Sequence, residues 1–429
     1  MITFLVSYPR DALPTDEALG LRIAELQKHY PLLSSTIIDS KTRKPYFQAR
    51  EQVWTTSDIV HHEPLASGED EEGVLKREIK RMSKEDVARP LWQVTIYQRE
   101  TAHLALSAAH ELFDGVGVRN LLNCLLAPSI AHLPKEVFDT PHFEDLVDVR
   151  PGYLQMVASL FTGLVLPRLA TFLQNYLKAQ TWPLRLELPT STCEEDLSVL
   201  SLSIDVIDQL KSVGKAHNVP TLHPILHTAF SIAIYSVFSD VLNPFIINTS
   251  IPRSERDPAF AYITGNYTSS ISHLFALQPP ESFWSLAESL GKAIKSPTIL
   301  SQARGRMGMF AYLPDPAIPE YGPTGWEDFI RNHDDGSRPP RQGVTISNLG
   351  HCALPPGATD LIWSGSAGPM SAPFNVLLLG HRGGIRWTTT WFEGSIVTRR
   401  EVKEVEAAFE RIVERLLASQ DDVRVGDLA

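Results

Sequence analysis

The sequence contains only three cysteines among its 429 residues, and they stand far apart at Cys124, Cys193 and Cys352. An odd and widely spaced set predicts neither a disulfide framework nor a cysteine-rich metal site, and it is typical of a reducing compartment. Basic residues are also in the minority, with 39 Lys and Arg against 50 Asp and Glu, for a net charge of −11. This balance disfavours nucleic acid and anionic membranes as partners. We therefore expect a cytoplasmic protein with no nucleic-acid partner.

Uninterrupted hydrophobic runs are lacking too. The first residues, "MITFLVSYPRDALP", have no basic n-region and no small-residue cleavage site, which predicts a strand and not a signal peptide. Residues 153–177 approach membrane-spanning length, but Pro167, Arg168 and six polar residues interrupt them. We expect a core or surface-packed helix pair here. The alternative is a helix that lies on a membrane surface, which would make the protein peripherally membrane-associated.

The remaining composition, with 43% hydrophobic and 21% charged residues, is that of a globular protein. A chain of this length exceeds one compact core, so two domains are expected. Strand and helix patterns run twice through the sequence, and the stretch between them is proline-containing and without periodicity. We predict an N-terminal lobe at 1–177, a linker at 178–195 and a C-terminal lobe at 196–429.

One short stretch, "SAAHELFDGVGVRN", places His110 four residues before Asp114, with Gly115 directly after. A metal site would need a helix to bring the histidine and the carboxylate to one face. The preceding residues alternate like a strand, glycines follow, and no third ligand lies nearby in the sequence, so we expect no metal site. The pair His223 and His227 has helical spacing, but it lies in an apolar stretch that predicts a buried helix, where packing is its expected role.

Two interpretations of His110 remain from the motif itself, a core histidine and a general base. Histidine supplies a base that is neutral near physiological pH. Asp114 could brace the loop, and Gly115 permits close backbone approach with a free N–H that faces a developing oxyanion. The motif is too short to separate the two.

Longer segments carry a resemblance. "PLWQVTIYQRETAHLALSAAHELFDGVGVRNLL" resembles the strand–strand–HxxxDG–helix region of the chloramphenicol-acetyltransferase-like superfamily, which includes nonribosomal condensation domains, plant BAHD acyltransferases and fungal alcohol acetyltransferases. "LSLSIDVIDQLKSVGKAHNVPTLHPILHTAFSIAI" resembles the opening of the second half of those proteins. "NTSIPRSERDP" and "ITGNYTSS" resemble their Arg-containing strand and Gly-Asn element, and "VTISNLG" is similar to the SNLG strand of the fungal branch. These segments occur in the expected order over most of residues 15–418.

Two departures narrow the resemblance. Condensation domains usually carry two histidines in tandem, and Ala109 takes the first position here. The BAHD motif Asp-Phe-Gly-Trp-Gly is absent, and "DLIWSGSAG" at 360–368 matches it poorly. The sequence is therefore most similar to the fungal alcohol acetyltransferase or condensation-domain-like branch.

The resemblance implies an α+β fold of two chloramphenicol-acetyltransferase-like lobes, a pseudo-dimer with an active-site tunnel between them. It implies an acyl-CoA-dependent O- or N-acyltransferase in which His110 is the general base and the Gly115 N–H an oxyanion donor. Asp114 would be structural and paired with an arginine of the second half; we expect Arg253, with Arg256 next in order.

The resemblance also implies side-chain contacts to substrate from Ser347 and Asn348. The protein would be a monomer with no permanently bound cofactor, acyl-CoA as co-substrate and a small-molecule alcohol or amine as acceptor. Two alternatives stay open. The donor could be held on a carrier protein, as in a condensation enzyme, or the chain could be a non-catalytic binding protein of the same fold.

Overall fold

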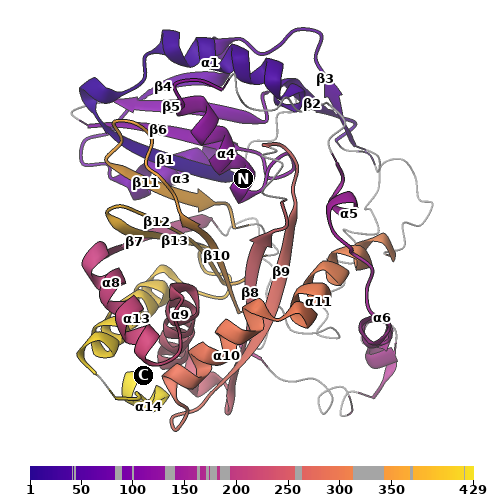
Figure 1. Cartoon of the computed structure of the whole chain (residues 1–429), viewed down its shortest axis with the longest axis vertical. Helices are drawn as coiled ribbons and strands as arrows, with labels where there is room; N and C mark the ends of the chain where they lie inside the picture. Colours follow the sequence, from indigo (N-terminus) through magenta and orange to yellow (C-terminus); the bar gives the residue numbers. More distant parts are fainter. Residues whose placement is uncertain are drawn as a thin grey trace.

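The computed structural model is a mixed α/β molecule whose described residues form two large sheets and a two-stranded sheet of β2 and β3 (Figure 1). It describes residues 1–40, 42, 45–82, 89–98, 101–130, 141–161, 165–170, 173, 181–183, 194–256, 263–312, 343–367, 371–419 and 421–429. Most of the predicted linker at 178–195 lies outside these residues.

The first sheet is built mainly from the N-terminal third and has the strand order β11-β1-β6-β5-β4. Helix α1 begins after Thr15, whose side chain accepts a hydrogen bond from the Ala18 N–H and caps the helix. Its apolar face packs with α4 into the core of this lobe. The bounds are β1 Ile2–Pro9, α1 Asp16–His29, β2 Ser35–Ile38, β3 Tyr46–Ala49, α2 Thr56–Ile59, β4 Val60–Pro64, α3 Glu71–Met82, β5 Trp92–Gln98, β6 Thr101–Ala108, α4 Gly115–Leu126, α5 Phe143–Leu146 and α6 Tyr153–Leu160.

The second sheet has the order β7-β13-β12-β10-β8-β9, and its helices lie below it in Figure 1. Helix α9 is apolar on every side and buried in this lobe, as predicted, which also accounts for the stretch Leu222–Val241 being long and apolar enough to span a membrane. The bounds are β7 Glu195–Ser203, α8 Ile204–Ala216, α9 Leu222–Phe238, β8 Phe245–Ser254, β9 Thr268–Leu277, α10 Phe283–Lys295, α11 Pro297–Gly308, β10 Val344–His351, β11 Asp360–Gly365, β12 Phe374–His381, β13 Gly384–Phe392, α13 Arg399–Ala418 and α14 Val425–Leu428.

Strand β11 belongs to the C-terminal part of the chain but pairs with β1 in the first sheet, from Ile2 opposite Gly365 to Ser7 opposite Asp360. Trp363 of this strand stacks on Phe4 in the N-terminal core. The two sheets therefore do not divide the strands at the predicted lobe boundary, because one C-terminal strand completes the N-terminal sheet.

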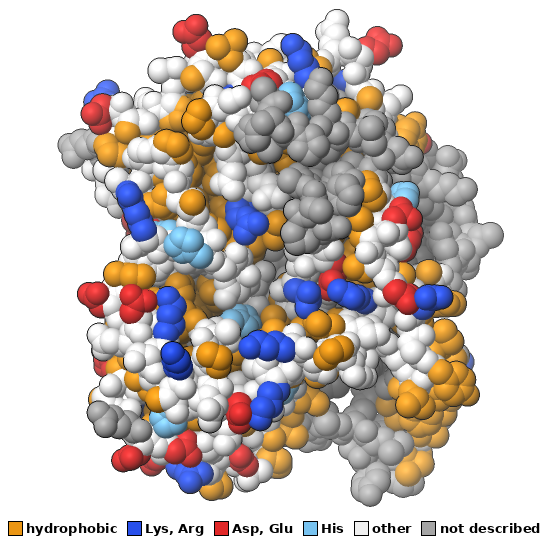
Figure 2. Space-filling model, viewed as in Figure 1, with side chains coloured by type: hydrophobic (Ala, Val, Ile, Leu, Met, Phe, Trp, Pro, Cys, Tyr) orange, Lys and Arg blue, Asp and Glu red, His pale blue; other side chains and the backbone are white. Residues whose placement is uncertain are grey.

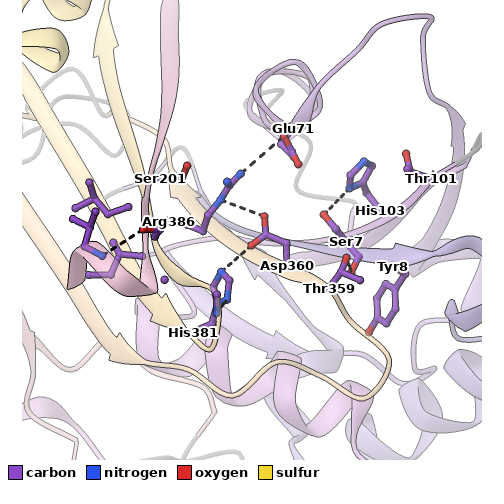
Figure 3. Close-up of a pocket in the computed structure, with 16 residues that line it drawn as sticks. Ser7, Tyr8, Glu71, Thr101, His103, Ser201, Thr359, Asp360, His381 and Arg386 are labelled. Carbon is purple, nitrogen blue, oxygen red and sulfur yellow. Dashed lines mark hydrogen bonds and ion pairs between the residues drawn. The ribbon is translucent and has the colours of Figure 1, made fainter. Parts of the chain in front are cut away.

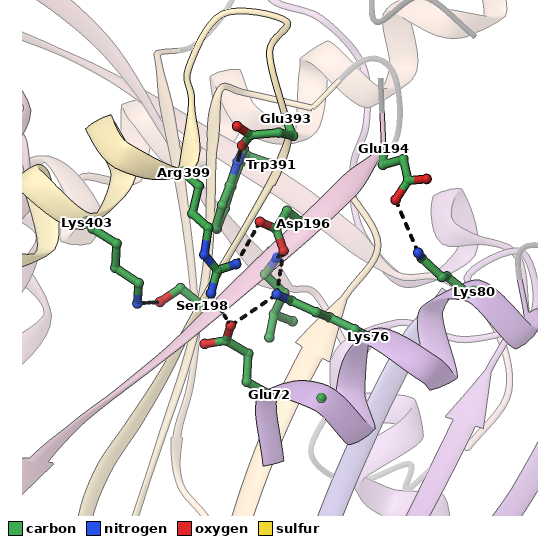
Figure 4. A network of polar contacts seen from close by, with 12 residues as sticks. Glu72, Lys76, Lys80, Glu194, Asp196, Ser198, Trp391, Glu393, Arg399 and Lys403 are labelled. Carbon is green, nitrogen blue, oxygen red and sulfur yellow. Dashed lines mark hydrogen bonds and ion pairs between the residues drawn. The ribbon is translucent and has the colours of Figure 1, made fainter. Parts of the chain in front are cut away.

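Helix α3 connects the lobes through a network of ion pairs (Figure 4). Arg399 of α13 lies 2.6 Å from Glu72 and 2.7 Å from Asp196 of β7, and Lys76 contacts both carboxylates. Lys80 adds a pair with Glu194 at 3.2 Å. The charged face of this helix thus contacts the second lobe and is not simply exposed to solvent. A network shares the entropic cost of ordering its side chains, so it contributes more than isolated surface pairs would.

Helix α6 rests on the molecular surface with its apolar side outward. Tyr153 and Leu154 are 80% and 81% exposed, and Figure 2 shows hydrophobic side chains gathered at the lower right, where Figure 1 places α6. The polar side holds it in place, since Gln155 Nε2 donates to the Gln302 carbonyl of α11 at 2.9 Å. Residues 153–160 therefore form a surface helix, whereas Leu166 further along the segment is buried.

Candidate active site

The loop between β6 and α4 is organised by Asp114. Its carboxylate caps α4, with Oδ1 2.7 Å from the Gly117 N–H, which explains why the helix begins at Gly115. Its second oxygen accepts from the Tyr267 N–H at 3.1 Å. The side chain is 2% exposed, so its charge must be matched by a cation.

That cation is Arg256. Its Nε lies 3.0 and 3.1 Å from the two carboxylate oxygens of Asp114, and the guanidinium is 5% exposed. The remaining N–H groups donate to the carbonyls of Ile263, Thr264 and Gly265. The sequence-based choice of Arg253 was therefore wrong. Arg253 lies within β8 and pairs with Glu255 at 3.0 Å. Arg256 comes two residues after the end of this strand.

Two glycines permit this close packing. A Cβ on Gly117 would lie 2.3 Å from the Ile263 carbonyl oxygen and 2.7 Å from Arg256 Nη2. A Cβ on Gly115 would lie 2.8 Å from the Trp363 ring. Both contacts are shorter than real Cβ atoms tolerate, so the turn can approach its neighbours only with glycine at these positions.

His110 lies at the turn that follows β6, and its side chain is exposed. Its closest described partner is Asn266, whose Nδ2 is 3.3 Å from Nδ1 of the imidazole and 3.5 Å from the His110 carbonyl oxygen. The Gly265 N–H donates to the Leu112 carbonyl at 2.7 Å, which joins the two loops. His110 is therefore not a core histidine, because the residue is exposed and its ring contacts a neighbouring amide.

Asn266 was not among the predicted site residues. It belongs to the "ITGNY" stretch, in which the resemblance marked a Gly-Asn pair without a role. Gly265 has φ +92°, a left-handed conformation that favours glycine and turns the next residue toward His110. The backbone conformation that exposes Asn266 is not visible in the sequence pattern.

The backbone N–H of Gly115, the predicted oxyanion donor, has no hydrogen-bond acceptor among the described residues. It is the first residue of a 12-residue helix, where backbone N–H groups and the helix dipole together favour negative charge. The loop between β6 and α4 thus places an imidazole and a backbone N–H that has no acceptor among the described residues within six positions of each other.

The two residues predicted on β10 face opposite ways. Leu349 packs against the N-terminal core and lies near Gly115, so Ser347, which shares its face of the strand, is directed toward the first lobe. Asn348 points to α9, where its Nδ2 lies 3.3 Å from Nδ1 of His223. Asn348 therefore contacts the second lobe, whereas Ser347 lies on the face of β10 that is turned toward the first lobe.

Asn348 begins a chain of hydrogen bonds whose directions can be assigned. The Gly350 N–H donates to Asn348 Oδ1 at 2.7 Å, so Nδ2 is the atom that donates to His223 Nδ1. The proton of His223 must then sit on Nε2, which lies 3.4 Å from His227 Nδ1. Burial lowers the pKa of His223 to about 4, which agrees with a neutral ring. The packing role expected for the two histidines is therefore accompanied by a polar one.

A separate cleft of about 800 Å³ is lined by His103, Ser7, Asp360 and Arg386 among others (Figure 3). His103 is near the start of β6, and about 17 Å of strand, at ~3.3 Å per residue, separates it from Ala108 at the other end. Within the described residues, no group of three or more His, Cys, Asp or Glu side chains is placed to hold a metal ion.

No family model matches the sequence, and no curated protein matches it. Solved structures match it over nearly its whole length. The first condensation domain of the CDA synthetase has a TM-score of 0.64 at 15% identity, covering 100% of this chain and 93% of that one. The condensation domain of the Monacolin K polyketide synthase MokA has 0.65 at 9% identity, with 99% and 93% covered. Polyketide synthase associated protein 5 from Mycobacterium tuberculosis has 0.61 at 13% identity, with 96% and 94% covered. The chain has the two-lobed fold of condensation domains.

Proposed function

We propose that the protein transfers an acyl group from a thioester to the hydroxyl or amine of a small acceptor, with His110 as general base. The observation that carries the proposal is the exposed imidazole of His110 beside the unused Gly115 N–H at the start of α4. Together they would provide the base and the oxyanion donor that acyl transfer requires.

In the proposed reaction, the hydroxyl oxygen or amine nitrogen of the acceptor molecule bonds to the thioester carbonyl carbon. His110 takes up the proton that this oxygen or nitrogen loses. The carbonyl electrons move to oxygen, where the Gly115 N–H and the α4 dipole stabilise the charge. Collapse of this intermediate breaks the C–S bond, and the imidazolium returns its proton to the departing sulfur. General acid–base assistance of this kind supplies roughly 10²–10⁴ in rate.

Asn266 is assigned a positioning role. An amide oxygen and nitrogen occupy equivalent places after rotation about χ2, so either atom of Asn266 can face Nδ1 of His110. With the oxygen inward, Nδ1 carries the proton and Nε2 is free to accept one from the acceptor. With the nitrogen inward, as in this structure, Nδ1 accepts and the proton sits on Nε2, so the amide must rotate before Nε2 can accept a proton.

The donor is proposed to be an acyl group held on a carrier protein. The neighbours support this choice, since two of them are condensation domains of a synthetase and a polyketide synthase. Free acyl-CoA is the second candidate, suggested by the similarity of "VTISNLG" to the fungal alcohol acetyltransferase branch. Both donors present a thioester, so the step at His110 is common to them.

The test incubates the protein with a panel of acyl-CoAs, or the same acyl groups on a phosphopantetheinylated carrier protein, together with mixed alcohols and amines. Mass spectrometry records the product and the released thiol. We expect turnover with the carrier-bound donors that falls by about 10²-fold or more in His110→Ala. His62→Ala, at an exposed histidine paired with Asp16, is the matched control and should retain activity.

If only free acyl-CoA supports turnover, the donor is acyl-CoA and not a carrier-bound acyl group. Near-normal transfer by His110→Ala would exclude the mechanism. The absence of thioester consumption with every donor would instead favour a binding protein of the same fold.

A further inference from the structure

The outward side of helix α6 is apolar. At about 3.6 residues per turn, five large side chains of the helix and its C-terminal cap fall on one side, and all are exposed: Tyr153, Leu154, Val157, Leu160 and Phe161. Gln155 and Ser159, four positions apart, fall on the opposite side. An ordinary surface helix buries its apolar residues and exposes its polar ones, so α6 has the reverse orientation.

The contact with α11 fixes this orientation. Gln155 Nε2 donates to the Gln302 carbonyl at 2.9 Å. A Cβ on Gly305 would lie 2.6 Å from Gln155 Oε1 and 3.0 Å from Pro151 Cα, so α6 approaches α11 as closely as a glycine allows. Rotating α6 to bury its apolar side would break this contact. The exposed apolar side is therefore built into the packing of the two helices, and an exposed surface of this kind marks a site of interaction.

Charged residues are distributed unevenly around α6. Residues 151–167 contain none, and residues 149–186 contain no Asp or Glu but four basic residues: Arg150, Arg168, Lys178 and Arg185. Arg150 is paired with Asp148, directly before this segment, whereas Arg168 is exposed after it. The segment is therefore basic within a chain whose net charge is −11. Acidic residues that lie more than a Debye length of about 8 Å from a partner are largely screened from it.

An apolar helix side within a basic segment matches the surface of a bilayer that contains anionic lipids. Apolar side chains enter the boundary between headgroups and acyl chains, and arginines and lysines attract the anionic headgroups. A tyrosine at the end of such a helix, as at Tyr153, is typical of this boundary. We propose that α6 docks the protein on a membrane surface that contains anionic lipids.

The helix is too short to cross the membrane. Its eight residues extend over about 12 Å at ~1.5 Å per residue, whereas the hydrocarbon core of a bilayer is about 30 Å thick. The polar contact of Gln155 with α11 also stays on the protein side. The helix therefore lies in the plane of the membrane surface with its outward side inserted.

Flotation of the full chain with lipid vesicles tests this. One set of vesicles contains phosphatidylcholine alone, and the other adds phosphatidylserine. We expect binding to the second set to be about tenfold tighter or more at low salt. Leu154→Ser removes an inserted side chain and should weaken this binding about tenfold or more. Arg168→Gln should weaken it severalfold, because one attractive charge is lost.

Leu21→Ser is the matched control, since Leu21 is 70% exposed on α1 and lies outside the basic segment. It should bind vesicles as the unmodified chain does. Circular dichroism shows whether each variant is folded, and Val157→Ser repeats the test on the same side of α6 if Leu154→Ser is not. Absence of binding to both vesicle types, equal binding to the two, or unchanged binding by the folded α6 variant overturns the proposal.

Two other occupants of the apolar side are tested without lipid. If Leu154→Ser dissociates a dimer in sedimentation velocity, this side joins two copies of the chain. If it weakens binding of an acylated carrier protein, this side docks that protein. Either result overturns the proposal. Vesicle binding is measured without acyl transfer, so its outcome is independent of the role of His110.

Discussion

Asp114 and Arg256 form a buried ion pair across 142 residues of sequence, with both carboxylate oxygens within 3.1 Å of the guanidinium Nε. The same aspartate caps α4 and accepts from the Tyr267 backbone. One side chain thus joins the His110 loop to the loop that carries Asn266. The position of the imidazole depends on this pair, which connects stability and activity at the site.

Breaking the pair from one side should destabilise the protein. Asp114→Asn leaves Arg256 buried without a counter-charge, at a cost of about 3–5 kcal/mol in the free energy of unfolding. Urea unfolding followed by circular dichroism measures the loss. Arg253→Met removes a partly exposed arginine whose partner Glu255 keeps Arg304, so it should cost much less. Equal losses in the two variants would contradict the assignment of Arg256.

Removing the amide beside His110 should affect turnover more than folding. Asn266 is exposed, and its replacement by alanine leaves the Asp114 pair intact. We expect Asn266→Ala to lower kcat severalfold with little change in KM or melting temperature, because the imidazole loses its orientation. In Asn266→Asp the carboxylate would stabilise the imidazolium, so the acid limb of the kcat/KM profile should move to higher pH. If the pH dependence of kcat/KM is unchanged in both variants, Asn266 does not orient His110.

The glycine that follows the motif should not tolerate a side chain. In Gly117→Ala the new Cβ would lie 2.3 Å from a backbone carbonyl, which forces α4 away from Arg256. We expect a loss of about 1–3 kcal/mol, as for other overpacked sites. Gly152→Ala is the matched control, since nothing lies within 4 Å of its Cβ position. Thermal melts of the two variants give the comparison, and a neutral Gly117→Ala would refute the packing argument.

Acid should unfold the protein partly through His223. Burial lowers its pKa from 6.5 to about 4 in the folded state, so the unfolded chain binds the proton more readily. Stability is therefore unaffected above about pH 6.5, falls as the pH drops below that value, and reaches its full loss near pH 4. The shift corresponds to about 3 kcal/mol. Unfolding free energies across this range should depend less steeply on pH in His223→Gln; an unchanged slope would contradict this origin.

The outward apolar side of α6 should contribute little to stability. Leu154 is 81% exposed. Leu154→Ser should therefore change the free energy of unfolding by no more than about 0.5 kcal/mol, as measured by urea unfolding. Leu121 of α4 is fully buried, and Leu121→Ala should cost about 2–5 kcal/mol. A large loss from Leu154→Ser would mean that α6 packs against part of the protein.

The spacing of apolar residues in the sequence predicts which helices and strands form and which of their faces are buried. Val402, Val405 and Phe409 stand at helical spacing, which predicts one apolar face, and all three are buried in α13. Residues 92–98 and 101–108 are rich in residues typical of strands, and they form the antiparallel pair β5–β6. Such patterns are readable because side chains three or four apart, or two apart, share a face whatever lies opposite.

Contacts between distant segments were not readable in this way. Arg253 and Arg256 are both arginines and stand only three positions apart. Only Arg256 lies where the chain leaves β8 and turns to Asp114. Asn266 reaches His110 through the left-handed conformation of Gly265. These relationships depend on register and backbone turns, which no periodicity records.

By itself, the sequence determined the succession of strands and helices, the buried helices and the turn that carries His110, because each follows from local periodicity and backbone preference. Only the tertiary structure decided the partner of Asp114, the place of β11 in the first sheet and the outward face of α6. The physical reason is that charge matching and burial are settled by what packs opposite a residue, and that surface comes from another part of the chain.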